Sequence, residues 1–149
     1  MHKNLEGALH MINTASGYAN KNPRQREALQ EAANASRCAE KIRHNPTSNG
    51  EEEISKHELI FRLHVQAASI FKECGEETMA KVERIGMGRA AYRIAFTHQA
   101  LHRYDKAQES YNIAVSILTS EGESRLSKKA AAAAEYCRRE LLMRSRREA

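Results

Sequence analysis

Two arginines, Arg89 and Arg93, lie four residues apart, a spacing that places both side chains on one face of a helix. Guanidinium groups suit carboxylates, because their N–H donors form a fork that matches two oxygen atoms. Tyr92, Phe96 and Gln99 lie on or beside the same face. The five residues together predict a peptide-binding surface. The alternative interpretation is an arginine pair that is simply solvated.

Two histidines, His98 and His102, are also four residues apart and could face one metal ion, as the histidines of a zinc-protease helix do. The residue after the first histidine is Gln99, so the glutamate that serves there as general base is missing. No third ligand lies nearby in the sequence. We therefore expect no metal and no cofactor, with His98 packed in a helical hairpin and His102 in its turn.

A thiol nucleophile is the third chemistry to weigh, because Cys74 lies near His57 and His64 in the sequence. Gly75 follows the cysteine and predicts the C-terminal end of a helix, which is the wrong pole of the helix dipole to stabilise a thiolate. A buried structural cysteine is the favoured interpretation. Without a glycine-rich phosphate loop, paired carboxylates or a complete triad, the sequence predicts no catalytic residues and no enzyme.

The C-terminal segment carries the basic excess of the chain. Eight basic and three acidic residues lie between Arg125 and Ala149, and this excess of five equals the formal charge of +5 of the whole chain. Such a patch could contact phosphates of a nucleic acid through counterion release, and the alternative is a solvated helix face. The predicted basic patch comprises Lys128, Lys129, Arg138, Arg139, Arg144, Arg146 and Arg147.

The composition favours closely packed helices. At 149 residues the chain fits one domain, residues 1–149, and only 5% of it is aromatic, with no Trp and two Pro. A β-sandwich needs more β-branched and aromatic side chains, so the sequence predicts an all-α fold. Three widely spaced cysteines favour a reducing, cytoplasmic setting over a disulfide framework. We also expect neither a signal peptide nor a membrane span.

Helical periodicity predicts about seven helices. The sequence HNPTSNGEEE, residues 44–53, indicates a linker, and Gly86–Gly88 is expected to interrupt the chain between a short fourth helix and the fifth. Asn22 and Pro23 form an expected helix start. The predicted parts are an N-terminal hairpin at 1–44, helices at about 3–19 and 23–44, antiparallel hairpins at 54–118 that turn near residues 75 and 102–104, and a helix at 124–147.

Small and large residues recur at fixed offsets between Ala90 and Leu118. Small side chains at Ala95, Ala107 and Ala114 would let two helices pack closely along a seam. The pattern comprises Ala91, Ile94, Ala95 and His98 on the first helix, Tyr104 and Asp105 at the turn, and Ala107, Tyr111 and Ala114 on the second helix.

This pattern resembles a tetratricopeptide repeat, and the stretch from Ala67 to Ala80 resembles a second, shortened one. The resemblance implies an array of helical hairpins with a peptide bound on the face of its first helices. It also implies that Arg89 and Arg93 form half of a clamp for a C-terminal carboxylate. The other half would lie one repeat earlier, where Val65 and Ser69 stand in place of the Lys and Asn of such a clamp.

Residues 88–147 also resemble a second family, the microtubule-interacting-and-transport domain, a three-helix bundle whose third helix carries a pattern like AEYCRRELL. Both families bind peptides. The sequence therefore predicts a non-catalytic protein–protein interaction module, an adaptor or chaperone, whose partner is a peptide or helix of another protein. The alternative is a helical protein that binds nucleic acid through the basic patch. Neither the oligomeric state nor the partner's identity is predicted.

Overall fold

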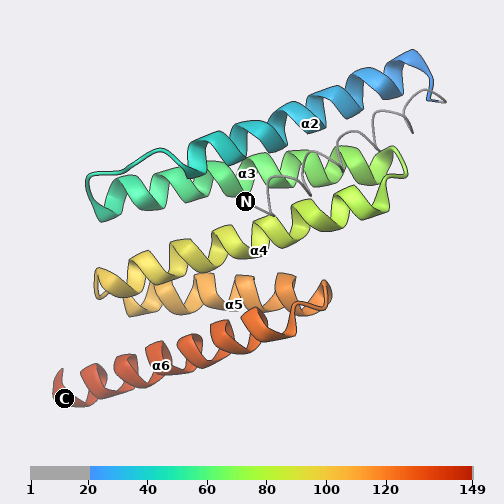
Figure 1. Cartoon of the computed structure of the whole chain (residues 1–149). Helices are drawn as coiled ribbons and strands as arrows, with labels where there is room; N and C mark the ends of the chain where they lie inside the picture. The colour runs from blue at the N-terminus through green and yellow to red at the C-terminus, as the bar shows by residue number, and fades with distance from the viewer. Residues whose placement is uncertain (1–20, 149) are drawn as a thin grey trace.

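A computed structural model describes residues 21–148 of the chain, and the regular secondary structure of this part is all α-helical, with no strand among its residues. The helices lie side by side in chain order and run in alternating directions (Figure 1). Each helix packs mainly against the helix that follows it. The helix expected at 3–19 lies outside the described residues. The five helices are α2 (Pro23–Arg43), α3 (Gly50–Glu73), α4 (Glu77–Ala100), α5 (Tyr104–Ser120) and α6 (Ser124–Glu148).

Side-chain caps fix the starts of α2 and α3. The expected cap at Asn22 is confirmed, since its Oδ1 atom accepts a hydrogen bond of 2.8 Å from the Gln25 amide. Asn49 caps α3 in the same way, accepting from the Glu52 amide at 2.9 Å. The expected linker at 44–53 is therefore wrong in its second half. Asn49 instead caps a helix that begins at Gly50, and the acidic first turn of this helix suits the positive end of the dipole.

The expected interruption at Gly86–Gly88 is also wrong, because α4 runs through both glycines. A Cβ atom at Gly86 would lie 2.7 Å from the His64 ring of α3, and one at Gly88 would lie 2.7 Å from Leu118 of α5. The glycines let α3 and α5 approach α4 closely, which offsets their cost of about 1 kcal/mol each inside a helix. Residues 21–148 consequently hold five helices, one fewer than the sequence predicts there.

The three-residue turns after α3, α4 and α5 share one design. A residue with positive φ stands in each turn, namely Gly75 (77°), His102 (59°) and Gly122 (76°). In each turn the amide of the next residue donates to a carbonyl in the last turn of the helix, at 2.8–2.9 Å. The expected turns near residue 75, near 102–104 and before residue 124 are confirmed.

The core confirms the predicted seam of small residues. Ala95 of α4 and Ala107 and Ala114 of α5 are fully buried, and Ala130 of α6 continues the same cluster. A second cluster joins α2, α3 and the start of α4, with Leu29 and Phe71 at its centre. Ala39, Ile60 and Ala90 connect α2, α3 and α4. Because its helices interlock in this way, the part from α2 to α6 can position a site that spans several of them.

The described helices include none that combines the length and the hydropathy needed to cross a bilayer.

Candidate functional site

A groove with a volume of about 440 Å³ opens between α2, α3, α4 and the start of α6. Three of the five predicted peptide-binding residues line it, all of them on α4. Its floor is largely apolar and its rim is charged. The lining residues are Arg43 of α2, Glu53, Lys56, His57 and Ile60 of α3, Gly86, Arg89, Ala90, Tyr92 and Arg93 of α4, and Leu126 of α6.

The charge of the groove is positive. Four cationic side chains line it, and Glu53 is its one acidic lining residue; of the four cations, Arg43 also pairs at 3.2 Å with Glu40, which lies outside the lining. Arg89 is exposed and has no ion-pair partner among residues 21–148. At the rim, the Lys129 ammonium group of α6 lies 5.9 Å from the centre of the Tyr92 ring, within range of a cation–π contact. An anionic group is therefore the ligand chemistry that this groove favours.

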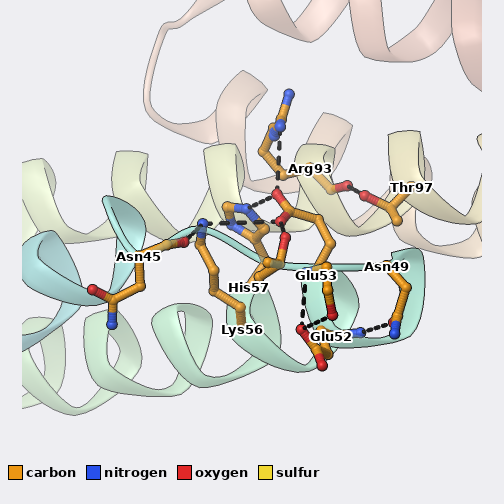
Figure 2. A network of polar contacts seen from close by, with 10 residues as sticks. Asn45, Asn49, Glu52, Glu53, Lys56, His57, Arg93 and Thr97 are labelled. Atoms are coloured by element: carbon orange, nitrogen blue, oxygen red, sulfur yellow. Dashed lines mark hydrogen bonds and ion pairs between the residues drawn. The ribbon is translucent and has the colours of Figure 1, made fainter.

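Glu53 is the centre of the polar network in the groove (Figure 2). Its carboxylate accepts a hydrogen bond from the Thr47 hydroxyl, lies 2.9 Å from His57 Nε2 and 3.9 Å from Lys56 Nζ, and accepts a long hydrogen bond of 3.5 Å from Arg93. The Thr47 hydrogen bond, with help from His57 and Lys56, lowers the pKa of Glu53 to about 2. One carboxylate thus ties the loop before α3, α3 itself and α4 together.

The buried His57 ring is held neutral. Burial lowers the pKa of His57, while the neighbouring Glu53 opposes that change. A carboxylate only accepts hydrogen bonds, so the neutral ring carries its proton on Nε2 and donates it to Glu53. Lys56 is fixed by a second contact, since its ammonium group donates to the Asn45 carbonyl at 2.8 Å. The α3 wall of the groove is accordingly ordered before any ligand arrives.

The two remaining predicted residues on α4 lie outside the groove lining. Phe96 is 48% exposed, and the Arg93 guanidinium group lies 5.8 Å from the centre of its ring. Gln99 instead has a structural contact, because its Oε1 atom accepts a hydrogen bond of 2.7 Å from the Tyr111 hydroxyl. The Tyr111 ring in turn meets the Tyr92 ring edge-on, with centres 5.4 Å apart. Gln99 therefore supports the groove through two aromatic rings.

The expected second half of a carboxylate clamp is not beside the arginine pair. Val65 and Ser69 line a separate hollow of about 400 Å³ together with Met87. Met87 and Arg89 are two residues apart and point to nearly opposite sides of α4, because a helix turns by about 100° per residue. The structure therefore places Val65 and Ser69 away from the groove that Arg89 and Arg93 line.

Four of the seven residues of the predicted basic patch make contacts with other side chains or with the backbone of the protein. Arg138 and Arg139 both bond to Glu135, at 2.6 Å and 3.3 Å. The Arg144 guanidinium group lies 4.6 Å from the Tyr104 ring centre and donates to the His102 carbonyl. Lys129 joins the rim of the groove. The remaining members of the patch, Lys128, Arg146 and Arg147, are exposed.

The histidine and cysteine candidates lie in structural positions. His98 is buried, and burial together with Arg103 and Lys106 lowers its pKa. His102 is in the turn and lies 3.2 Å from the Tyr104 hydroxyl. Cys74 is buried at the end of α3. In the range 21–148 no group of three or more side chains is arranged to hold a metal ion.

Sequence reasoning missed one buried polar pair. His64 Nδ1 of α3 lies 2.5 Å from Glu83 Oε2 of α4, and the Glu83 side chain is only 2% exposed. The opposite ring nitrogen, His64 Nε2, is buried with no hydrogen-bond partner in the described part of the chain. The sequence does contain a signal for this pair, because Glu83 lies among the apolar residues of α4 and an acidic residue there needs a buried partner. The groove residues of α2, α3 and α6 were also missed, because only the packing of separate helices brings them to α4, and Glu53 falls in the segment predicted as a linker.

Comparison of the chain with protein-family models, with curated proteins and with solved structures gives no match.

Proposed function

We propose that this chain is a non-catalytic protein–protein interaction module, an adaptor or chaperone, that binds a peptide or helical segment of a partner protein. The observation that carries the proposal is the open groove between α2, α3, α4 and α6, with an apolar floor and a cationic rim. Its binding residues are Arg89, Tyr92 and Arg93, with Phe96 at the edge and Gln99 in support.

The residue types in the groove support this proposal. Tyr and Arg are enriched among the residues that dominate binding energy at protein interfaces. Leu126 and the Tyr92 ring, both partly exposed, give an apolar side chain a surface to cover, while Arg89 and Arg93 can hold carboxylates. A ligand with both kinds of group, such as a peptide that contains acidic and apolar residues, matches the groove better than a small ion does.

The arrangement of the helices is consistent with a tetratricopeptide-like array, which we include in the proposal. Such arrays are built from antiparallel helices that contact mainly their chain neighbours, and they present extended binding surfaces. The alternative likeness to a microtubule-interacting-and-transport domain involves α4, α5 and α6. The groove also draws residues from α2 and α3, which favours the array.

Binding of nucleic acid through α6 has less support. Four of the seven residues in the predicted basic patch are engaged by Glu135, Tyr104 or Tyr92. All seven side chains are exposed, but the pairing of Arg138 and Arg139 with Glu135 offsets part of the positive charge that counterion release requires.

Peptide binding can be tested with a random peptide library displayed on phage and selected against the immobilised full chain. The affinity of a selected peptide is then measured for Tyr92→Ala, Arg93→Ala and Arg24→Ala. We expect each of the first two changes to weaken binding roughly thirtyfold, the effect of losing about 2 kcal/mol at an interface. Arg24 is exposed at the start of α2, away from the groove at its end, and its variant is the matched control.

Unchanged affinity in both groove variants would contradict the proposal. Loss of peptide binding on changing Lys128, Arg146 and Arg147 to Gln, with full binding by the groove variants, would place the binding element on α6 instead. Circular dichroism of every variant checks that the helices are retained.

A further inference from the structure

The acidic residue of the groove is placed where a ligand's carboxylate would bind. Glu53 belongs to α3, and it reaches across to the guanidinium group of Arg93 on α4 (Figure 2). Arg93 is one of the cations that an anionic ligand would use, and Arg89 lies one helical turn away from it. The protein therefore supplies its own carboxylate to a cationic groove.

The contact between Glu53 and Arg93 is easily exchanged. It is long for a hydrogen bond at 3.5 Å, and the Arg93 side chain is 53% exposed. Exposed ion pairs of this kind contribute little to stability, because solvent screens them and long side chains lose entropy on pairing. Arg93 can consequently turn from Glu53 to another carboxylate at little cost.

Glu53, by contrast, is held in place. Its side chain is 18% exposed and keeps its contacts with Thr47, Lys56 and His57 when Arg93 leaves. Its pKa of about 2 also means that it stays ionised at physiological pH. An incoming anion therefore meets a fixed negative charge beside the arginine that it needs.

We propose that the groove binds an acidic segment of another protein and that Glu53 is a resident competitor for Arg93, which the carboxylate of that segment must displace. This inference rests on the proposed function. The acidic nature of the segment follows from charge complementarity, since four cations face one carboxylate in the groove lining. Glu53 would then set the affinity, so that a segment must bring enough carboxylates, or an apolar contact with the floor, to outcompete it.

The test uses the full chain and a fluorescein-labelled peptide of alternating Glu and Leu, with fluorescence anisotropy as the readout. The same peptide with Gln in place of Glu is the neutral control. Glu53→Gln keeps an oxygen acceptor for Thr47 but removes the charge, and we expect it to tighten binding of the acidic peptide roughly fivefold to tenfold. We expect little change for the neutral peptide.

Glu52→Gln is the matched control, because Glu52 is the neighbouring residue, carries the same charge and bonds to Ser48 rather than to Arg93. We expect it to leave the affinity unchanged within about twofold, since exposed charges are screened. The decisive comparison adds Arg93→Ala. If Glu53 competes for Arg93, Glu53→Gln gains nothing in the Arg93→Ala background, whereas a general charge effect would give the same gain in both backgrounds.

Glu53→Asp is a second variant that keeps the charge and shortens the side chain, which withdraws the carboxylate from Arg93. This variant should also tighten binding of the acidic peptide. If the Gln variant does not fold, the Asp variant tests whether Glu53 competes for Arg93. Weaker or unchanged binding of the acidic peptide by the folded Glu53 variants would overturn the inference, and so would equal gains with and without Arg93.

The outcomes separate the inference from the proposed function. Failure of the acidic peptide to bind, together with groove-dependent binding of a neutral peptide from the library, would overturn the inference alone. Failure of every peptide to bind would overturn both. Arg93-dependent binding of duplex RNA, with no binding of the acidic peptide, would show that the groove takes phosphates and would also overturn the inference.

Discussion

The two sides of α4 are built on different principles. Toward α5 the interface is a seam of alanines, in which Ala95, Ala107 and Ala114 are fully buried. Toward α3 the interface mixes apolar contacts, such as that of Ile60 with Ala90, with polar ones, namely the buried His64–Glu83 pair and the network around Glu53. A seam of small apolar residues holds helices together by close packing. Hydrogen-bonded side chains, by contrast, must be held at fixed positions to meet one another. Between α3 and α4 they also form the charged wall of the groove.

This contrast teaches where stability and function lie in the molecule. The α4–α5 seam can change little without overpacking, and it contains no group that a ligand could use. The α3–α4 side exposes Arg89 and Arg93, and it also contains the buried His64–Glu83 pair. One helix therefore gives the fold a seam of fully buried alanines and the groove three of its predicted binding residues.

The largest effect is expected at the buried pair. Glu83→Ala leaves His64 buried with neither ring nitrogen paired in the described part, and the loss of one partner of a buried pair costs about 3–5 kcal/mol. Urea unfolding gives the free energy of unfolding. Glu109→Ala, which removes an exposed glutamate of the neighbouring helix α5, is the control and should change it by less than about 0.5 kcal/mol.

A double variant sharpens this prediction. Changing His64 and Glu83 both to Leu should cost less than Glu83→Ala alone, because no buried polar group is left without a partner. A loss below about 1 kcal/mol for Glu83→Ala would contradict the view that the pair holds α3 against α4.

The next largest effect is expected in the seam. Ala107→Leu adds a branched side chain at a position with no exposed surface, and overpacking of this kind costs about 1–3 kcal/mol. Ala132→Leu places the same side chain on an exposed position of α6 and is the matched control. Thermal unfolding, monitored by circular dichroism, gives the melting temperatures of the two variants. Equal melting temperatures for both variants would show that the seam has room to spare.

The smallest effect is a dependence of stability on pH that arises at the α3–α4 interface and near the end of α4. Burial lowers the pKa of His57 and of His98 below the ordinary value of 6.5. Below pH 6.5 the unfolded chain therefore binds more protons than the folded chain at these two sites, so their contribution to stability falls as the pH drops through that value. Glu53 adds stability above pH 4.5, which is lost as the pH falls toward 2.

Urea unfolding at pH 7.5 and pH 5.5 measures this dependence. The wild-type chain should be less stable at the lower pH, and a variant with His57→Gln and His98→Gln should lose less of its stability between the two values. His44→Gln changes an exposed histidine and should behave as the wild type does. A double variant with the wild-type pH dependence would contradict the assignment to these two rings.

Local patterns in the sequence predicted one side of α4 much better than the other. The seam could be predicted because small residues at helical spacing indicate close packing whatever the partner is. The continuity of α4 through Gly86 could not, since it depends on the His64 ring, which comes from another helix. Arg89, Tyr92 and Arg93 could be placed on one helix face from their spacing. Arg43, Glu53 and Leu126 join them only through the packing of four helices.

The order of the helices in space has a kinetic consequence. Each helix packs mainly against the next one in the chain. The turns between α3 and α4, between α4 and α5, and between α5 and α6 are each three residues long. Contacts of this kind are close in sequence, so forming them requires little loop closure. Proteins dominated by such contacts fold in microseconds to milliseconds. The chain can thus assemble by adding one helix at a time to its neighbour, and the groove is completed only when α6, the last of the helices that line it, has docked.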